Sequence, residues 1–268
     1  MSKQTPLVLK LGGVILDTPG ALESLFNAIS DFWSEQIRAS QSKRPIVIVH
    51  GGGCVVDELM SKLNLPVAKI DGLRVTPRSQ IDIVVGALAG SANKILMGKA
   101  KQANLKAIGL CLGDGDSVLV SPISEALGHV GRATAGDPEF LELLLSKGYL
   151  PIISSIGITE NGERMNVNAD EAAVAVAKCL SGELALLADV SGVLDANKTL
   201  IPKMDRALAD ELIHAKVITD GMVVKVNAAL DAATNLGAPV AIASFKAFDE
   251  LPKLFSGHSI GTLMLNTQ

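Results

Sequence analysis

Short, almost uninterrupted apolar runs recur along the chain, and stretches with helical periodicity separate them. The runs are rich in Val, Ile and Leu and occupy residues 7–11, 46–50, 107–112, 150–156, 183–188 and 239–244. Each is too short for an ordinary helix, and most lack polar alternation, which is typical of strands buried on both faces of a parallel sheet. The pattern therefore predicts parallel strands connected by helices.

Helical periodicity is clearest early in the chain. Its apolar side chains fall on one helical face: Leu22, Leu25, Phe26, Ile29, Phe32 and Trp33. Asp137 and Pro138 form a helix start signal, because Asp caps well and Pro suits the first helical position. Residues 81–100 and 220–236 are predicted to be helical as well.

Alternating strands and helices predict an α/β protein with helices on both faces of its sheet, a three-layer αβα sandwich around a mainly parallel open sheet. An Asn-Gly pair within residues 157–167 predicts a hairpin that projects from this sheet. The best internal boundary lies near Ser181 and Gly182, after a helical stretch. We therefore expect two lobes, residues 1–181 and 182–268.

Composition and charge exclude several classes of protein. The 268 residues are 48% apolar, 3% aromatic and carry a net charge of −4, without a basic run, which disfavours binding to nucleic acid. Three widely spaced cysteines without a C-x-x-C pair suit the reducing cytoplasm. Lys10 interrupts the first apolar run, so no signal peptide is predicted, and no stretch is read as a membrane span. We expect a soluble cytoplasmic protein.

Glycine-rich turns follow three of the predicted strands. They are LGG at 11–13, HGGG at 50–53 and GDGD at 113–116. Ligands of open α/β sheets bind at the carboxyl ends of strands, where loops and helix N-termini offer free N–H groups. The common nucleotide fingerprints fail, since Val56 and Val118 stand where a third glycine is needed and no G-x-x-x-x-G-K-[ST] occurs. Each turn is either an anion site or a packing device.

Three charged residues stand near these turns or at predicted helix starts. Lys10 lies in a strand that should be buried, so its ammonium either reaches water at the strand end or binds an anion. Asp170 falls in the first turn of a helix that Asn168 can cap, a favourable place for a carboxylate whatever the function. Lys225 follows one turn into the helix that Asp220 opens, and by itself is an ordinary surface lysine.

Taken together, six segments give the chain a family resemblance. They are KLGG (10–13), HGGG (50–53), GLRVTP (72–77), MNVNAD (165–170), DVSGVL (189–194) and TDGMVVKV (219–226). In this order, and over essentially the whole chain, they resemble the amino acid kinase family. The resemblance implies the fold of that family. It also implies ATP-dependent phosphorylation of the γ-carboxylate of N-acetyl-L-glutamate, the second step of arginine biosynthesis.

The resemblance also implies catalytic roles for residues on the glycine turns and helix starts. Lys10 would neutralise the transferred phosphoryl group, and Lys225 would stabilise charge on the ADP side. The N–H groups of Gly13 and Gly52 would bind equatorial oxygens of that group. Asp170 would lie between the two lysines and orient both.

Substrate contacts follow from the same resemblance. Arg74 would clamp the α-carboxylate of the acceptor, and Asn166, Gly52 and Gly53 would hold the rest of acetylglutamate. The alternative for Arg74 is an ordinary surface arginine on a hairpin. ATP would bind the second lobe through Asp189, Val190, Ser191, Gly192, Val193, Leu194, Val217, Ile218 and Thr219. Mg²⁺ would be held mainly by the phosphates, so no protein metal ligand is expected.

Several related functions share part of these sequence features. Glutamate 5-kinases, aspartate kinases, carbamate kinases and nucleoside monophosphate kinases share the ATP half of the fold, and a non-catalytic nucleotide-binding relative is a further alternative.

The resemblance implies a homodimer formed through the first lobe. Only six residues precede the first predicted strand, so we expect a dimer without the additional N-terminal helix and the arginine inhibition of some relatives. Strong inhibition by millimolar arginine would contradict this expectation.

Overall fold

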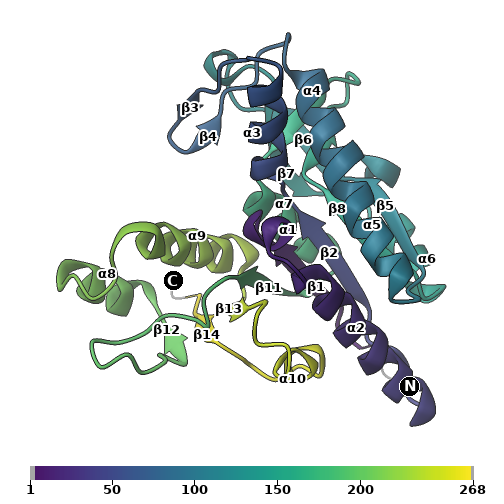
Figure 1. Cartoon of the computed structure of the whole chain (residues 1–268), viewed down its shortest axis with the longest axis vertical. Coiled ribbons are helices and arrows are strands. Elements are labelled where there is room, and N and C mark those ends of the chain that lie inside the picture. The colour runs from purple at the N-terminus through teal and green to yellow at the C-terminus, as the bar shows by residue number, and fades with distance from the viewer. Residues whose placement is uncertain (1–3, 267–268) are drawn as a thin grey trace.

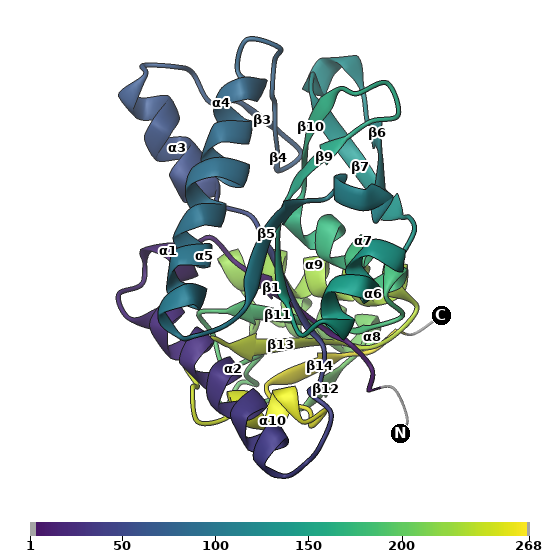
Figure 2. The ribbon, with the colours of Figure 1, turned by 90° about the vertical axis from the view of Figure 1, so that its right-hand side faces the viewer.

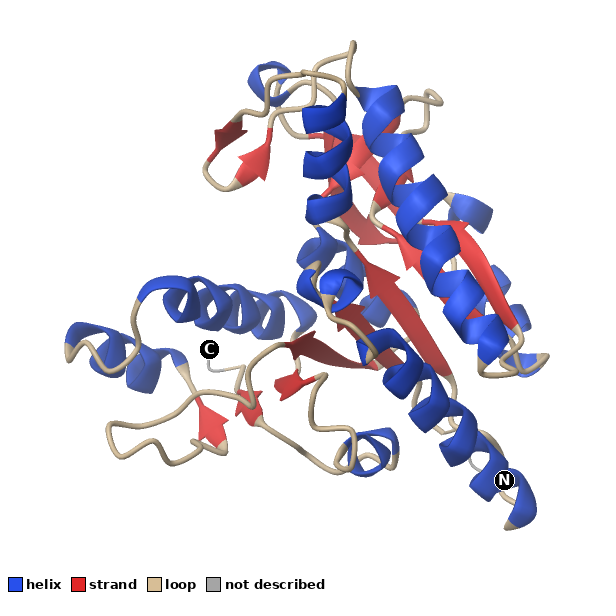
Figure 3. Cartoon of the chain, in the orientation of Figure 1, coloured by secondary structure: helices blue, strands red, loops and turns tan. Residues whose placement is uncertain are grey.

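An eight-stranded sheet forms the centre of the protein (Figures 1 and 3). The structure is a computed structural model that describes residues 4–266. Part of the stretch ahead of the first strand, on which the expectation about an N-terminal helix rests, lies outside these residues. The sheet has the order β12 (Lys203–Met204), β14 (Thr262–Met264), β13 (Val240–Ser244), β11 (Glu183–Ala188), β1 (Leu7–Leu11), β2 (Ile46–His50), β8 (Leu150–Ser154) and β5 (Ala107–Cys111).

The predicted strands are confirmed with one change. From β13 to β5 the strands run parallel, whereas β14 is antiparallel to β13, so the sheet is mainly parallel. The run at 150–156 divides, because β8 ends at Ser154 and the next strand, β9 (Ile156–Ile158), joins another sheet. A continuous apolar run does not reveal where a chain leaves one sheet for another.

Helices cover both faces of the sheet and complete three layers, as predicted. The helices are α1 (Val14–Asp17), α2 (Ala21–Arg38), α3 (Gly53–Lys62), α4 (Ile81–Val85), α5 (Asn93–Gln102), α6 (Glu139–Ser146), α7 (Ala169–Cys179), α8 (Arg206–His214), α9 (Asp220–Leu236) and α10 (Leu251–Phe255). Buried residues of α2, α5 and α10 belong to one core cluster, and those of α6, α7, α8 and α9 to another. Figure 2 shows α2 and α5 on one side of the sheet and α6 and α7 on the other.

The two cores explain the apolar runs. Side chains alternate between the faces of a strand, so Leu7, Leu9 and Leu11 of β1 enter the core beneath α2, and Val8 enters the core beneath α7. Because both faces are covered, both must be apolar. Lys10 has the same parity as Val8 and therefore belongs to the face that α7 covers.

The longest helical stretch runs from Ile81 to Gln102 and contains a π-helical segment, η1 (Gly86–Ala92), between α4 and α5. Its length and its mean hydropathy of 1.3 would suffice for a membrane span, so the prediction that no stretch has this length and composition was wrong. Leu96 and Ala100 pack in the core beneath α2, so one face of this helical stretch is part of the core. Of the 18 consecutive residues that make up its most apolar part, 39% are buried.

A second sheet was not predicted from the sequence. It has the order β6 (Val118–Pro122), β7 (Val130–Ala135), β10 (Arg164–Val167) and β9. Its β9–β10 pair is the hairpin expected from the Asn-Gly sequence. A further hairpin joins β3 (Lys69–Ile70) to β4 (Leu73–Arg74). These strands are short and carry mixed polarity, so no strong period marks them.

The predicted boundary at 181–182 falls between α7 and β11. The sheet continues across it, because β11 pairs with β1. The buried side chain of Arg44, just before β2, also reaches across: its guanidinium donates to the carbonyls of Leu254 and Phe255 and pairs with Glu183 at 2.8 Å. The division into two lobes stays a prediction.

Candidate active site

The predicted site residues gather where the strand order changes direction. From β1 the chain continues to β2 on one side, whereas β11 lies on the other side of β1. Such a reversal leaves a crevice at the carboxyl ends of the strands. The turns that follow β1, β2 and β11 all lie at this edge, and they carry Gly12, Gly51 and Asp189.

A first pocket brings the two predicted lysines together, and we call it the two-lysine pocket. Its polar lining is Lys10, Gly12, Asp170, Asp189 and Lys225, and its apolar lining is Val14, Leu186, Leu187, Ala188, Ala228, Ile242 and Phe245. These residues come from β1, α1, α7, β11, α9, β13 and the loops that follow the strands. The structure thus brings together side chains that lie more than two hundred positions apart in the sequence.

Each lysine of this pocket has its own carboxylate. Lys10 Nζ lies 2.8 Å from Asp170 Oδ1, and Lys225 Nζ lies 2.5 Å from Asp189 Oδ1. The hydrogen bond from Lys225 lowers the pKa of Asp189 below its ordinary value, so this carboxylate is ionised at neutral pH. Asp170 contacts Lys10 but is not paired with Lys225 here. That Asp170 organises both lysines stays a prediction.

A second pocket, which we call the glycine pocket, surrounds the turn after β2. It is lined by Gly51, Gly52, Gly53, Val56, Lys69, Gly72, Leu73, Arg74, Leu88, Val130, Ser155, Asn166, Val167, Asn168 and Ala169. The N-termini of α3 and α7 both meet it, since Gly52 and Asn168 are their N-cap residues. Helix N-termini present free N–H groups and favour anions, so the pocket suits a negatively charged ligand.

Close packing explains why this turn needs glycine. Gly52 has a φ of 155°, and a Cβ there would lie 3.0 Å from Leu88 Cδ2 and 3.2 Å from the Cβ of Ala92. Both neighbours belong to η1. A side chain at Gly52 would strain the backbone and push the turn away from η1. The packing role of this turn is therefore confirmed, and its role as an anion site stays a prediction.

The two pockets adjoin at the first turn of α7. Ala169 lines the glycine pocket, and the next residue, Asp170, lines the two-lysine pocket. Asn168 fixes this turn, because its side chain accepts hydrogen bonds from the N–H groups of Asp170 at 2.8 Å and Glu171 at 3.2 Å. Gly13 lies beside the glycine turn, since a Cβ built on it would be 3.8 Å from the nitrogen of Gly53. A group transferred between ligands in the two pockets would cross this junction.

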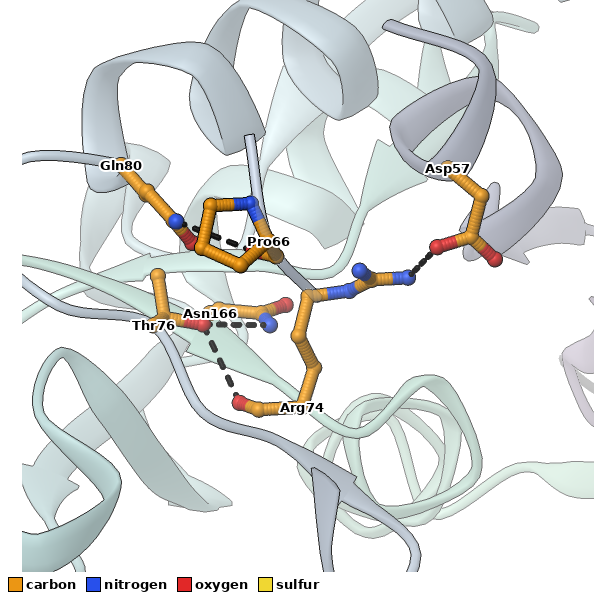
Figure 4. Close-up of polar contacts among 6 residues, drawn as sticks. All are labelled: Asp57, Pro66, Arg74, Thr76, Gln80 and Asn166. Atoms are coloured by element: carbon orange, nitrogen blue, oxygen red, sulfur yellow. Dashed lines mark hydrogen bonds and ion pairs between the residues drawn. The ribbon is translucent and has the colours of Figure 1, made fainter. Parts of the chain in front are cut away.

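Arg74 and Asn166 both reach the glycine pocket and are linked through one hydroxyl (Figure 4). Asn166 Nδ2 donates to Thr76 Oγ1 at 3.2 Å, and that hydroxyl donates to the carbonyl of Arg74 at 3.1 Å. Arg74 Nη2 lies 2.5 Å from Asp57 Oδ1. Arg74 Nη1 is buried without a hydrogen-bond partner among residues 4–266, so the guanidinium keeps one unused donor.

The residues predicted to bind ATP lie on two segments. Asp189 lines the two-lysine pocket, and the loop from Val190 to Leu194 leads away from β11. Within that loop Gly192 has a φ of 137°, and a Cβ there would lie 2.6 Å from Thr262 Oγ1. The second segment, residues 217–219, leads into α9, with Thr219 as its N-cap residue. The contacts of all these residues with ATP, Asp189 included, stay predictions.

The third glycine segment does not join the site. Residues 113–116 follow β5 at the edge of the sheet and line neither pocket. A Cβ on Gly115 would lie 2.5 Å from the ring of Phe140, which shows that this turn packs against α6. Its glycine therefore serves packing, one of the two readings that the sequence left open.

Sequence reasoning missed several partners of the expected residues. Asp57 and Thr76 contact Arg74, and Ser155 lines the glycine pocket beside Asn166. The sequence predicts only an ATP contact for Asp189, and its ion pair with Lys225 is a further finding. Asp57 and Asp189 lie 17 and 36 positions from the residues they pair with, so no local spacing in the sequence indicates these ion pairs. Across the part of the chain that the structure describes, no group of three or more His, Cys, Asp or Glu is placed to bind a metal ion.

His50 anchors the glycine turn from inside the protein. Its side chain is 1% exposed, its Nδ1 donates to the carbonyl of Gly51 at 2.7 Å, and its Nε2 accepts from Asn93 Nδ2 at 3.1 Å. Burial lowers the pKa of His50 to about 4, so the ring is neutral at physiological pH. A proton on Nε2 would also face the amide group that now donates to it.

Known proteins similar to this chain agree on one family. The sequence model of the amino acid kinase family matches residues 5–244. An acetylglutamate kinase from Pectobacterium atrosepticum is 58% identical over 97% of this chain and 99% of its own length. The crystal structure of smu.665 from Streptococcus mutans is 28% identical with a TM-score of 0.74, covering 98% of this chain and 99% of that one. Carbamate kinase from Giardia lamblia, bound to AMP-PNP, is 16% identical with a TM-score of 0.63 over the full length of both chains, which shows a shared fold.

The buried His50 predicts a pH dependence of stability. In the unfolded chain His50 binds a proton near pH 6.5, whereas in the folded protein it does so only near pH 4. The contribution of neutral His50 to the free energy of unfolding is therefore complete above pH 6.5 and is lost as the pH falls toward 4. The loss should approach about 3 kcal/mol of unfolding free energy. Urea unfolding between pH 7 and 4.5 should show a flatter pH dependence for His50→Gln than for the wild type. His214→Gln, at an exposed histidine of α8, is the control; parallel curves for the wild type and His50→Gln would contradict the assignment.

Proposed function

This chain belongs to the amino acid kinase family, and we propose that it transfers the γ-phosphoryl group of ATP to the γ-carboxylate of N-acetyl-L-glutamate. The product is N-acetyl-L-glutamyl 5-phosphate, and the reaction is the second step of arginine biosynthesis. The observation that carries the proposal is the junction of the two pockets, where a pocket with two lysines meets a pocket built for an anion. We place the enzyme in the cytoplasm, where its three free cysteines stay reduced.

The acceptor needs no general base, because a carboxylate is ionised at neutral pH. The difficulty is electrostatic, since one anion attacks another through a charged transition state, so catalysis depends on positioning and on positive charge. Lys10 neutralises the transferred phosphoryl group, and Lys225 stabilises the charge that develops on the ADP side. The N–H groups of Gly13 and Gly52 hold its equatorial oxygens without adding a mobile charge.

The acceptor occupies the glycine pocket. The unused Nη1 of Arg74 binds the α-carboxylate of acetylglutamate, and Asn166 with the backbone of Gly52 and Gly53 holds the rest of the molecule. This orientation directs the γ-carboxylate toward the junction beside Ala169. The buried, unsatisfied donor of Arg74 supports it, because such a donor loses the free energy of hydration until a partner arrives.

ATP occupies the side of the crevice formed by the second lobe, residues 182–268, and the first lobe, residues 1–181, binds the acceptor. The segments 189–194 and 217–219 hold the nucleotide. Both carboxylates of the two-lysine pocket are engaged by lysines, and the described residues offer no metal cluster. Mg²⁺ would enter with ATP, and the phosphate oxygens would mainly hold it.

An assay of ADP release with a panel of acceptors tests the function directly. We expect ADP release with N-acetyl-L-glutamate and little with glutamate, aspartate, carbamate or UMP. Activity with one of those other acceptors alone would assign the chain to the corresponding kinase of the family. ATP binding without turnover of any acceptor would make it a non-catalytic relative.

The two lysines should act on the transition state. Lys10→Ala and Lys225→Ala should each lower kcat on the order of 10²–10³-fold and change both KM values less, because the charge they neutralise develops only during transfer. Replacing either lysine with Arg should restore little of the lost kcat, since a planar guanidinium does not replace a compact ammonium.

Asp170→Asn should lower kcat too. Combined with Lys10→Ala it should lower kcat by less than the product of the two single effects. Lys62→Ala, at an exposed lysine of α3, is the control, and near-normal kcat in folded Lys10→Ala or Lys225→Ala would end this mechanism.

We propose a homodimer that forms through the first lobe. The apolar stretch Ile81–Gln102 supports this proposal, because only 39% of its most apolar 18 residues are buried in the single chain. Within it the side chain of Ile95 is 46% exposed. The stretch lies near β5, which is an edge strand of the central sheet. Light scattering should give twice the chain mass, and Ile95→Asp should shift it toward the monomer. Lys62→Asp serves as a control at an exposed site. A monomer for the wild type, or a hexamer, would overturn the proposal.

A further inference from the structure

We infer that Asp57 is a positioning residue of the acceptor site. It holds Arg74 by Nη2, fixes the plane of the guanidinium beside the glycine pocket, and remains bound when the acceptor arrives. The inference rests on the proposed function, which supplies the identity of the acceptor. It adds a residue that touches no substrate but sets the affinity for one of them.

The ion pair joins two elements that the chain connects only loosely. Asp57 lies on α3, one turn after Gly53, and Arg74 lies on the two-residue strand β4. Their atoms Oδ1 and Nη2 are 2.5 Å apart. The side chain of Arg74 is only 10% exposed, whereas that of Asp57 is 51% exposed. Asp57 is therefore a hydrated anchor for a guanidinium that is almost removed from water.

The remaining donor of Arg74 indicates what the anchor is for. Nη1 is buried and has no hydrogen-bond partner among the described residues, although Arg74 lines the glycine pocket (Figure 4). A guanidinium presents its donors in a rigid planar fork, so fixing Nη2 also fixes the direction of Nη1. One guanidinium can then serve two carboxylates at once, Asp57 through one nitrogen and the acceptor through the other.

The backbone of Arg74 is held independently of its side chain. Thr76 is fully buried, and its hydroxyl donates to the carbonyl of Arg74 while accepting from Asn166. Gln80 Nε2 donates to the carbonyl of Pro66, which fixes the segment that leads into the hairpin. The base of the hairpin is thus secured without Asp57. Loss of Asp57 should free the guanidinium alone and leave the fold intact.

An opposite role for Asp57 is possible on chemical grounds and predicts the opposite result. Asp57 could occupy Arg74 as a competitor, which the acceptor carboxylate must displace. Removing the competitor would then lower KM for the acceptor, whereas removing a positioning residue raises it. The sign of the change decides between the two roles.

The test compares Asp57→Asn and Asp57→Ala with the wild type. We expect KM for acetylglutamate to rise about 10-fold, the effect of losing one charge-assisted hydrogen bond that orders the site, with kcat and KM for ATP unchanged within twofold. Glu58→Gln is the matched control, because Glu58 neighbours Asp57 on α3 and pairs with Lys62 on the surface. An unchanged or lower KM for acetylglutamate in both Asp57 variants would overturn the inference.

A double-mutant cycle shows whether Asp57 acts through Arg74. Arg74→Ala alone should raise KM for acetylglutamate roughly 30- to 1,000-fold. In that background Asp57→Asn should have no further effect, and multiplicative effects would show that Asp57 acts elsewhere. Unchanged thermal unfolding and KM for ATP would show that the variants fold. The wild type distinguishes the two failures: without turnover of acetylglutamate the proposed function fails, and with turnover but no coupling only this inference fails.

Discussion

An ammonium group in a strand covered on both faces is the constraint on which the site depends. Lys10 lies between Val49 and Leu186 in the register of the sheet, and its side chain belongs to the face covered by α7. An unpaired charge there would be costly, so the fold must bring a carboxylate to it. Asp170 meets this need only because Asn168 starts α7 at that place. The strand, the helix cap and the ion pair are therefore one arrangement.

The parts of the fold that the sequence predicted are those that local patterns determine. Strands covered on both faces need continuous apolar runs, and the first turn of α7 follows from the capping residue Asn168. The second sheet was missed because its short strands have no clear period. The pairing of Lys225 with Asp189, and of Arg74 with Asp57, joins distant surface-type residues that no spacing relates. The sequence also could not show which glycine turn only packs, because the clash between Gly115 and the ring of Phe140 depends on the position of α6.

Both pockets share a common electrostatic design. Three of their cationic side chains are each paired with a carboxylate: Lys10 with Asp170, Lys225 with Asp189, and Arg74 with Asp57. The carboxylates limit the repulsion between neighbouring cations and hold them in place before any ligand binds. In each pair the protein supplies one anion, and in the proposed function the substrates would supply a second anion for the same cation. Preorganised charge of this kind needs little rearrangement during the reaction.

The continuity of the central sheet determines how the crevice can close. A linker between separate domains would allow free rotation, but here β1 and β11 share a ladder of backbone hydrogen bonds across residues 181–182, where the lobe boundary is predicted. Arg44 adds a second tie, from the start of β2 to the end of α10. If the two predicted lobes move toward each other, the sheet between them must twist or bend. The elastic strain in the sheet would then favour the reverse movement without a separate opening device.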